Sequence, residues 1–215
     1  MSRRQELADV AIATLAREGM RGLTHRAVDR AAGLPEGSTS YYFRTRDALL
    51  EAVVRRLAEV TAGDLGAVPT SAPGGLDGLA RAIAAVLERW VTEEADRHLA
   101  RYELALEANR RPRIRELLSD TGARLRDRVV DLLAAAGVPV EPERAADLVA
   151  YLDGLVFDRL AGARTARGRA DDFADRVRPL LAAMAAGGPK PASTARAGNR
   201  APSARPGRQR RAGGA

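Results

Sequence analysis

Apolar residues recur along most of the chain at the three- and four-residue spacing of amphipathic helices. In residues 3–18, Leu7, Val10 and Leu15 fall on one face, and Gly19 follows as a C-terminal stop. No segment shows the sustained alternation of apolar and polar residues that is typical of strands. The pattern therefore predicts an all-α fold of about nine helices.

Capping residues, prolines and glycines set the expected limits of these helices. Thr24 is a favourable N-cap for a short helix over about residues 25–32, and a second short helix covers about residues 35–42. Pro179 lies inside the last apolar pattern, where proline predicts a bend or a restart of the helix. The longer helices are expected over about residues 46–65, 76–94, 96–109, 112–136, 142–161 and 171–186.

Residues 187–215 differ in composition from the rest of the chain. This segment holds seven basic residues and no acidic one, among Gly, Pro, Ala and Ser. It cannot bury enough apolar surface to offset the entropy of ordering, so we expect a disordered basic tail. The net charge of +7 is a property of this tail, because residues 1–186 are balanced. The charge alone therefore does not mark the folded part as a nucleic-acid binder.

The composition excludes several classes of site. There is no Cys, and the two His residues are far apart in sequence, which argues against thiolate chemistry and a metal centre. No nucleophile elbow, phosphate-binding loop or dinucleotide fingerprint is present. No apolar run has the length of a membrane span, and no signal peptide is visible. We therefore expect a cytoplasmic protein that is not an enzyme and uses no cofactor.

The stretch from Leu23 to Leu50, LTHRAVDRAAGLPEGSTSYYFRTRDALL, has the layout of a helix-turn-helix motif. Two short helices are joined by a tight turn that contains Gly33, and in such motifs the second helix enters the major groove of DNA. Small residues at the start of that helix leave backbone N–H groups open to a phosphate or a base edge. The hydroxyls of Tyr41 and Tyr42 can donate to phosphate oxygens.

Over residues 3–57 the sequence resembles the TetR/AcrR family of bacterial transcriptional repressors. The resemblance rests on a first helix ending in Glu-Gly and on the blocks GLTHRAVDRAAGL, EGSTSYYF and RTRDALLEAVV. Two positions depart from the family pattern, because Ser40 stands where Tyr is common and Arg46 where Lys is common. The first change leaves out one commonly used phosphate contact. The second keeps the positive charge but adds a planar fork of donors.

The resemblance implies which residues meet DNA and how the chain is divided. Phe43 is expected in the core, because it precedes the next helix and can pack against it. The expected domains are a helix-turn-helix DNA-binding domain at 1–56, an effector-binding and dimerisation domain at 57–186, and the basic tail at 187–215. The expected contacts with phosphates or base edges are Thr24, Arg26, Glu36, Gly37, Ser38, Thr39, Tyr41, Tyr42 and Arg46.

Dimerisation is expected from geometry as well as from the resemblance. One short recognition helix reads few base pairs, so a homodimer on a palindromic operator supplies the missing affinity. The helices over about 142–161 and 171–186 are the expected interface, since the first has apolar residues on one side and small residues on another.

Four aromatic residues of the C-terminal half are either ordinary core residues or the lining of an effector cavity. They are Trp90, Tyr102, Tyr151 and Phe157. The predicted function is a repressor released from double-stranded DNA by a small, largely apolar ligand. The alternative is a dimeric helical sensor that binds DNA mainly non-specifically.

Overall fold

The computed structural model describes residues 1–69, 74–162 and 173–186, and these residues form nine helices and no strand. The all-α prediction is confirmed. The helices are α1 (Arg3–Gly22), α2 (His25–Ala31), α3 (Ser38–Tyr42), α4 (Arg46–Gly66), α5 (Gly75–Thr92), α6 (Ala95–Glu107), α7 (Pro112–Ala135), α8 (Pro142–Leu160) and α9 (Phe173–Ala186).

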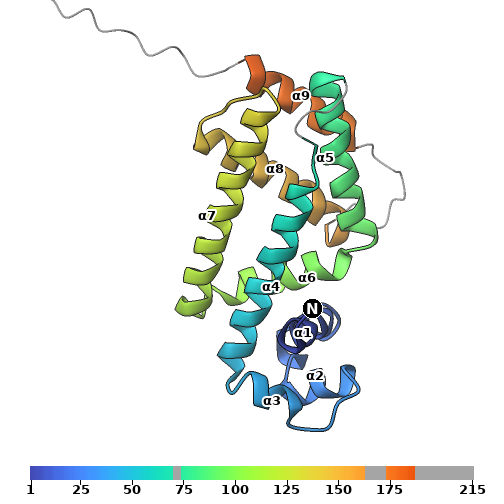
Figure 1. The fold of residues 1–215 in the computed structure, drawn as a ribbon, viewed down its shortest axis with the longest axis vertical. Coiled ribbons are helices and arrows are strands. Elements are labelled where there is room, and N and C mark those ends of the chain that lie inside the picture. Colours follow the sequence, from blue (N-terminus) through green and yellow to red (C-terminus); the bar gives the residue numbers. More distant parts are fainter. Residues whose placement is uncertain (70–73, 163–172, 187–215) are drawn as a thin grey trace, which may run out of the picture.

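Two groups of helices are joined by α4 (Figure 1). The head consists of α1, α2 and α3, which form the lower part of the molecule in this view. The body consists of α5 to α9, of which α6 lies nearest the head. Since α4 runs from the end of α3 up to the body, the predicted domain boundary after residue 56 lies inside a continuous helix.

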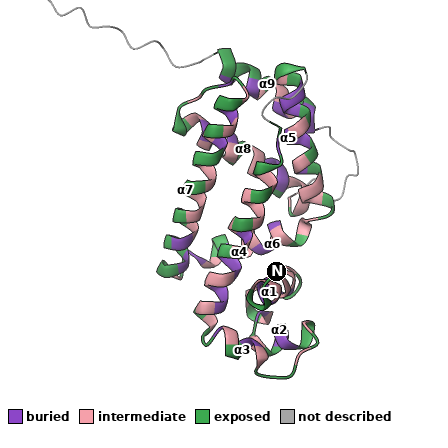
Figure 2. Ribbon diagram, in the orientation of Figure 1, coloured by how far each residue is buried: buried purple, intermediate pink, exposed green. Residues whose placement is uncertain are grey.

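Buried apolar residues on the inward faces of the helices form two clusters (Figure 2). The N-terminal core joins α1, α2 and the first half of α4 to α6 and the start of α7. The C-terminal core joins α5, α7, α8 and α9, with Leu65 of α4 packed against it. Because α4 and α7 contribute to both cores, the head is packed directly onto the body.

Local sequence explains where the head helices begin and end. Ser2 forms a capping box with Gln5 at the start of α1. Thr24 accepts the N–H of Ala27 at 3.1 Å, which starts α2 where the sequence predicts it. At Gly19 the backbone leaves the helical region (φ 66°, ψ −177°), so the predicted stop is a break, after which one more turn continues to Gly22.

Three further expectations concern Pro179, the C-terminal tail and membrane-spanning helices. Of the predicted bend or restart at Pro179, the restart is wrong, because one helix runs across this residue. The bend stays a prediction. The expected basic tail at 187–215 lies outside the described residues, as do residues 171–172 at the expected start of the last helix. None of the helices in the described ranges combines the length and the apolar character needed to cross a membrane.

Candidate nucleic-acid interface

Two turns of the chain place α3 against α2. Gly33 and Gly37 adopt positive φ values of 65° and 95°, a region that favours glycine. The N–H of Leu34 donates to the carbonyl oxygen of Asp29 at 2.9 Å, which folds the chain back after α2. The resulting helix–turn–helix confirms the layout that the sequence predicts over Leu23–Leu50.

The side chain of Asp29 holds the start of α3, a role that the sequence did not reveal. Asp29 is 2% exposed, and its carboxylate accepts the N–H of Gly37 at 2.8 Å and the N–H of Thr39 at 2.7 Å. The Thr39 hydroxyl donates to the same carboxylate. Burial raises the pKa of Asp29, but these hydrogen bonds and the charge of His25 outweigh it and hold the pKa below its usual value.

Thr39 lies inside the head and not on its surface. Its side chain is fully buried and its hydroxyl is bound to Asp29. The predicted contact between Thr39 and DNA is therefore not available to its side chain in this structure. Gly37 remains exposed, but its N–H is already bound to Asp29 and is not free for a phosphate.

Other predicted contact residues do lie on the surface of the helix–turn–helix. Tyr41 is 81% exposed and packs edge-on against the half-buried Tyr42, with 5.1 Å between ring centroids. The exposed side chains of Arg26 and Glu36 form an ion pair that spans from α2 to the turn. Such an exposed pair contributes little to stability, so DNA phosphates could compete for the guanidinium.

Two further predicted contacts have hydroxyl groups with local partners. Thr24 is exposed, and its hydroxyl oxygen is the N-cap acceptor of α2, so the hydroxyl proton is not used in this cap. The Ser38 hydroxyl donates to the carbonyl of Pro35 at 2.6 Å. Thr24 and Ser38 therefore bind the backbone at the starts of α2 and α3, respectively.

Arg46 binds the protein backbone. Its guanidinium donates to the carbonyl oxygens of Met20 and Leu23, at the end of α1 and just before α2. The side chain is partly exposed at the start of α4. Arg46 thus ties α4 to the α1–α2 connection while keeping its charge at the edge of the head.

The end of α3 is fixed by residues from α1 and α2. The Nε2 atom of His25 lies 2.7 Å from the carbonyl oxygen of Phe43. Arg4 donates to the carbonyl oxygen of Tyr42 at 2.8 Å and stacks 4.7 Å from the Phe43 ring centroid. Phe43 itself is buried, as predicted. Arg4 was missed because its partners lie almost forty residues along the chain.

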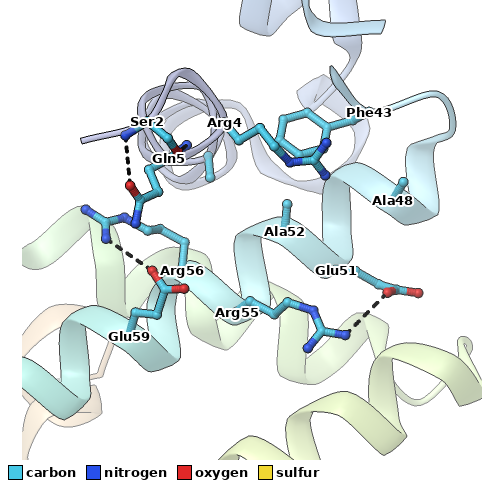
Figure 3. A pocket seen from close by; sticks show the side chains of 11 residues that line it. Ser2, Arg4, Gln5, Phe43, Ala48, Glu51, Ala52, Arg55, Arg56 and Glu59 are labelled. Carbon is cyan, nitrogen blue, oxygen red and sulfur yellow. Dashed lines mark hydrogen bonds and ion pairs between the residues drawn. The ribbon is translucent and has the colours of Figure 1, made fainter. Parts of the chain in front are cut away.

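An open cleft of about 430 Å³ lies beside this contact, between α1 and α4. Figure 3 shows Arg4 reaching across it to Phe43, and Arg55 and Arg56 turned towards Glu51 and Glu59. Both glutamates of the cleft are thus paired with arginines. Among the described residues, no group of His, Asp or Glu side chains is placed to hold a metal ion.

Two of the four aromatic residues that the sequence offers as core or as cavity lining bind carboxylates of neighbouring helices. Trp90 donates to Asp64 of α4 at 2.8 Å and stacks on His98 of α6, with 4.6 Å between ring centroids. The Tyr102 hydroxyl of α6 donates to Asp153 of α8 at 3.2 Å. Burial and the Asp153 charge raise the pKa of Tyr102.

Tyr151 and Phe157 lie on the surface of α8. They are 41% and 46% exposed, so the prediction that they line an internal cavity is not supported by their placement. The Phe157 ring packs edge-on against the Tyr102 ring, with 5.0 Å between ring centroids. Because Tyr151 and Phe157 are both exposed, they form an apolar strip on the surface of α8.

His98 is a buried polar residue of the body. It is buried beside a cavity of about 10 Å³, which is room for a single water molecule. Its Nδ1 atom has no hydrogen-bond partner among the described residues. Burial, followed by the charges of Arg101 and Arg97, lowers the pKa of His98 to about 3 against the opposing effect of Asp153.

Comparison with known proteins adds an independent line of evidence. The family described as bacterial regulatory proteins, tetR family, matches residues 7–53. The family described as tetracyclin repressor-like, C-terminal domain, matches residues 74–196. Comparison with curated proteins gave no match.

Several solved structures are similar to this chain. The multidrug binding protein EbrR complexed with imidazole is 32% identical, with a TM-score of 0.62 over 90% of this chain and 98% of EbrR. A member of the TetR family from Streptomyces coelicolor A3 is 32% identical, with a TM-score of 0.65 over 86% and 98% of the two chains. A transcriptional regulator from Rhodococcus sp. Rha1, at 21% identity, shows the fold alone, with a TM-score of 0.70 over 86% and 97%.

Proposed function

The chain belongs to the TetR family of DNA-binding transcriptional regulators, and from this premise we propose that it is a repressor that binds a palindromic operator as a homodimer and is released by a small ligand. Its family domains indicate a transcription regulator and not an enzyme.

The placement of α3 is the observation that carries the DNA-binding proposal. This helix lies at the end of the head, is anchored to α2 at its start and to α1 and α2 at its end, and leaves Tyr41 almost fully exposed. Arg26 and Arg44 add positive charge on exposed positions nearby. A rigid short helix with an exposed aromatic hydroxyl and flanking cations suits the major groove and its phosphates.

The apolar strip of α8 supports the homodimer. Tyr151 and Phe157 are exposed, and between them Gly154 offers a surface where an added Cβ would meet no atom within 4 Å. Exposed aromatic residues beside a small residue allow a second helix to approach closely. A symmetric dimer through this strip doubles the number of base pairs read by a helix of five residues.

The contacts between α4, α5 and α6 support ligand control of the head. Asp64 lies near the end of α4 and binds Trp90 of α5 and Arg97 of α6, the latter at 3.7 Å. A ligand that entered beside Trp90 would have to enlarge the small cavity next to His98 and so displace α4 relative to α6. The Trp90 ring stacks on His98, Arg101 lies over the Tyr102 ring, and carboxylates hold the polar atoms of both aromatic residues. An apolar ligand body would therefore take the place of His98 or Arg101 against one of these rings.

Selection of DNA from a randomised duplex library tests the function. A specific repressor enriches a palindromic duplex and gives a saturable shift on it in excess competitor DNA. The alternative, a sensor that coats DNA non-specifically, enriches no sequence and loses its shift to competitor. The enriched palindrome, called the selected duplex below, then serves as the operator in the remaining tests.

Malachite green is a direct probe of ligand control, because EbrR has been solved in complex with it. Trp90 is the only tryptophan of the chain, so its fluorescence reports on binding near α4 and α6. We expect quenching and release of the selected duplex over the same dye concentrations. A DNA complex of an unrelated protein controls for dye acting on the duplex itself. Quenching without release would contradict the proposed ligand control.

A further inference from the structure

The recognition helix of this chain cannot hold its own shape. It has five residues, and isolated helices of that length are not stable in water. Its N-cap is Gly37, in a left-handed conformation and with no side chain to accept the first N–H groups. Something outside α3 must therefore satisfy those donors and set the direction of the helix.

Asp29 supplies the missing cap from the neighbouring helix. Its carboxylate oxygens separately accept the N–H groups of Gly37 and Thr39, at 2.8 Å and 2.7 Å. The backbone carbonyl of Asp29 also accepts the N–H of Leu34 in the turn. One residue of α2 thus binds the chain at two points between the helices, Leu34 and Gly37, and at Thr39 inside α3, which fixes both the position and the direction of α3.

Burial makes this arrangement specific for a carboxylate. A buried ionised group is unfavourable unless its lone pairs are used, and here three donors use them. An amide at position 29 has the same shape, but its NH₂ group would face one of the two backbone N–H donors. That donor would then lose its acceptor inside the head.

We propose that Asp29 is a positioning residue for DNA recognition: its carboxylate caps α3 in trans from α2 and holds the exposed face of α3 in the orientation that reads DNA. This inference rests on the proposed function. It assigns to an acidic residue that is buried inside the head control over how well the helix fits the groove.

The test compares Asp29→Asn with Val28→Ala, a neighbouring variant that destabilises the head but leaves the Asp29 carboxylate and its bonds to the N–H groups of α3 in place. Val28 is fully buried in the N-terminal core, so its truncation leaves a cavity. Both variants are studied well below their melting temperatures, where circular dichroism shows them folded. We expect Asp29→Asn to bind the selected duplex about tenfold more weakly and to discriminate less against random DNA, whereas Val28→Ala binds like the parent chain.

Amide signals measured by NMR test the cap without DNA. In the parent chain, the N–H signals of Gly37 and Thr39 should be protected from hydrogen exchange and should shift with pH as Asp29 titrates, with a midpoint below that of an ordinary Asp. In Asp29→Asn the titration disappears and at least one of the two amides exchanges faster. Thr39→Val, which removes only the hydroxyl donor, should keep both amides protected and the titration present.

The outcomes separate this inference from the proposed function. A folded Asp29→Asn variant with parental affinity, discrimination and amide protection overturns the positioning role. Equal losses of DNA affinity in Asp29→Asn and Val28→Ala overturn it as well, since stability alone would then explain both. If library selection enriches no duplex, the proposed function fails and the claim about DNA fails with it, while the amide measurements still decide whether Asp29 caps α3.

Discussion

The head and the body use their charged side chains in different ways. In the head and at the first residue of α4, three charged side chains bind backbone atoms: Asp29 accepts two N–H groups, Arg46 donates to two carbonyls, and Arg4 donates to one. In the body, several charged groups bind side chains on other helices. Asp64 of α4 binds Arg89 and Trp90 of α5, and the Asp153 carboxylate of α8 binds Arg101 of α6.

Helix length explains this difference. The head contains helices of seven and five residues, whose ends make up most of their length and leave many backbone groups in need of partners. The long helices of the body satisfy their own backbone groups, so their side chains are free to bridge between helices. Backbone contacts fix a shape, whereas side-chain bridges can be exchanged. The head is therefore suited to rigid recognition and the body to rearrangement.

The largest expected effect tests whether these two regions unfold as one. Leu50→Ala opens a cavity in the N-terminal core and should lower the free energy of unfolding by about 3 to 5 kcal/mol. Because α4 and α7 contribute to both cores, we expect the Trp90 fluorescence of the body to shift in denaturant together with the far-ultraviolet circular dichroism. Leu133→Ala in the C-terminal core is the matched variant. A Trp90 transition that stays at its parental midpoint in Leu50→Ala would show that the regions unfold separately.

A second prediction concerns the exposed strip that only the body carries. Phe157→Asp places a charge in the proposed dimer contact and should weaken dimerisation by about 2 kcal/mol or more, which is about 30-fold in Kd. Analytical ultracentrifugation over a dilution series measures the change. Leu106→Asp is the control, because Leu106 is an exposed leucine on α6 outside the strip. Equal dissociation of both variants, or of neither, would remove α8 from the interface.

A third prediction uses pH to address the body alone. The pKa of His98 is lowered to about 3 in the folded chain, so below its ordinary value of 6.5 only the unfolded chain takes up that proton. Stability linked to His98 is therefore complete above pH 6.5 and is lost as the pH falls towards 3. Between pH 7.5 and 5 the loss should be about 2 kcal/mol. Asp29, whose pKa is also lowered, contributes only at more acidic pH.

His98→Phe removes the titrating group and should flatten this pH dependence in urea denaturation measured at both pH values. His25→Gln, at the only other histidine of the chain, is the control and should keep it. If His98→Phe loses as much stability as the parent chain on acidification, the buried neutral histidine is not the cause.

The sequence predicts local features of both regions well. The helix start at Thr24 follows from a side chain that caps the next few residues, and Phe43 is buried because it precedes an apolar helix face. These features depend on neighbours within about four residues. The family resemblance over residues 3–57 works for the same reason, since it is carried by a continuous run of such signals.

Contacts between distant segments could not be predicted in the same way. The bond from Thr39 to Asp29 spans ten residues, and those from Trp90 to Asp64 and Tyr102 to Asp153 span 26 and 51. One local signal was present in the head: an acidic residue follows Val28 on the buried side of a short helix, where a carboxylate needs donors. In the body, an aromatic residue on an apolar helix face gives no sign of whether its polar atom meets a cavity or a carboxylate.

The smallest expected effects are changes in DNA affinity in Tyr42→Phe and Arg46→Ala. They distinguish residues that contact DNA from residues that only stabilise the head. Tyr42→Phe removes one hydroxyl and should weaken binding to the selected duplex by about 1 kcal/mol, with no change in the salt dependence of affinity. Arg46→Ala should weaken binding by about 1 to 2 kcal/mol and lower the slope of log affinity against log salt by about one.

Arg46 has two separable roles in this comparison, because its guanidinium both binds the carbonyls of Met20 and Leu23 and carries a charge at the edge of the head. Arg46→Lys keeps the charge but cannot span two carbonyls with a planar fork. We therefore expect the lysine variant to recover the parental salt slope while its melting temperature stays near that of Arg46→Ala. If the salt slope is the same in the parent chain, Arg46→Lys and Arg46→Ala, no phosphate meets residue 46. Its effect on DNA binding would then pass through the backbone alone, as that of Asp29 does.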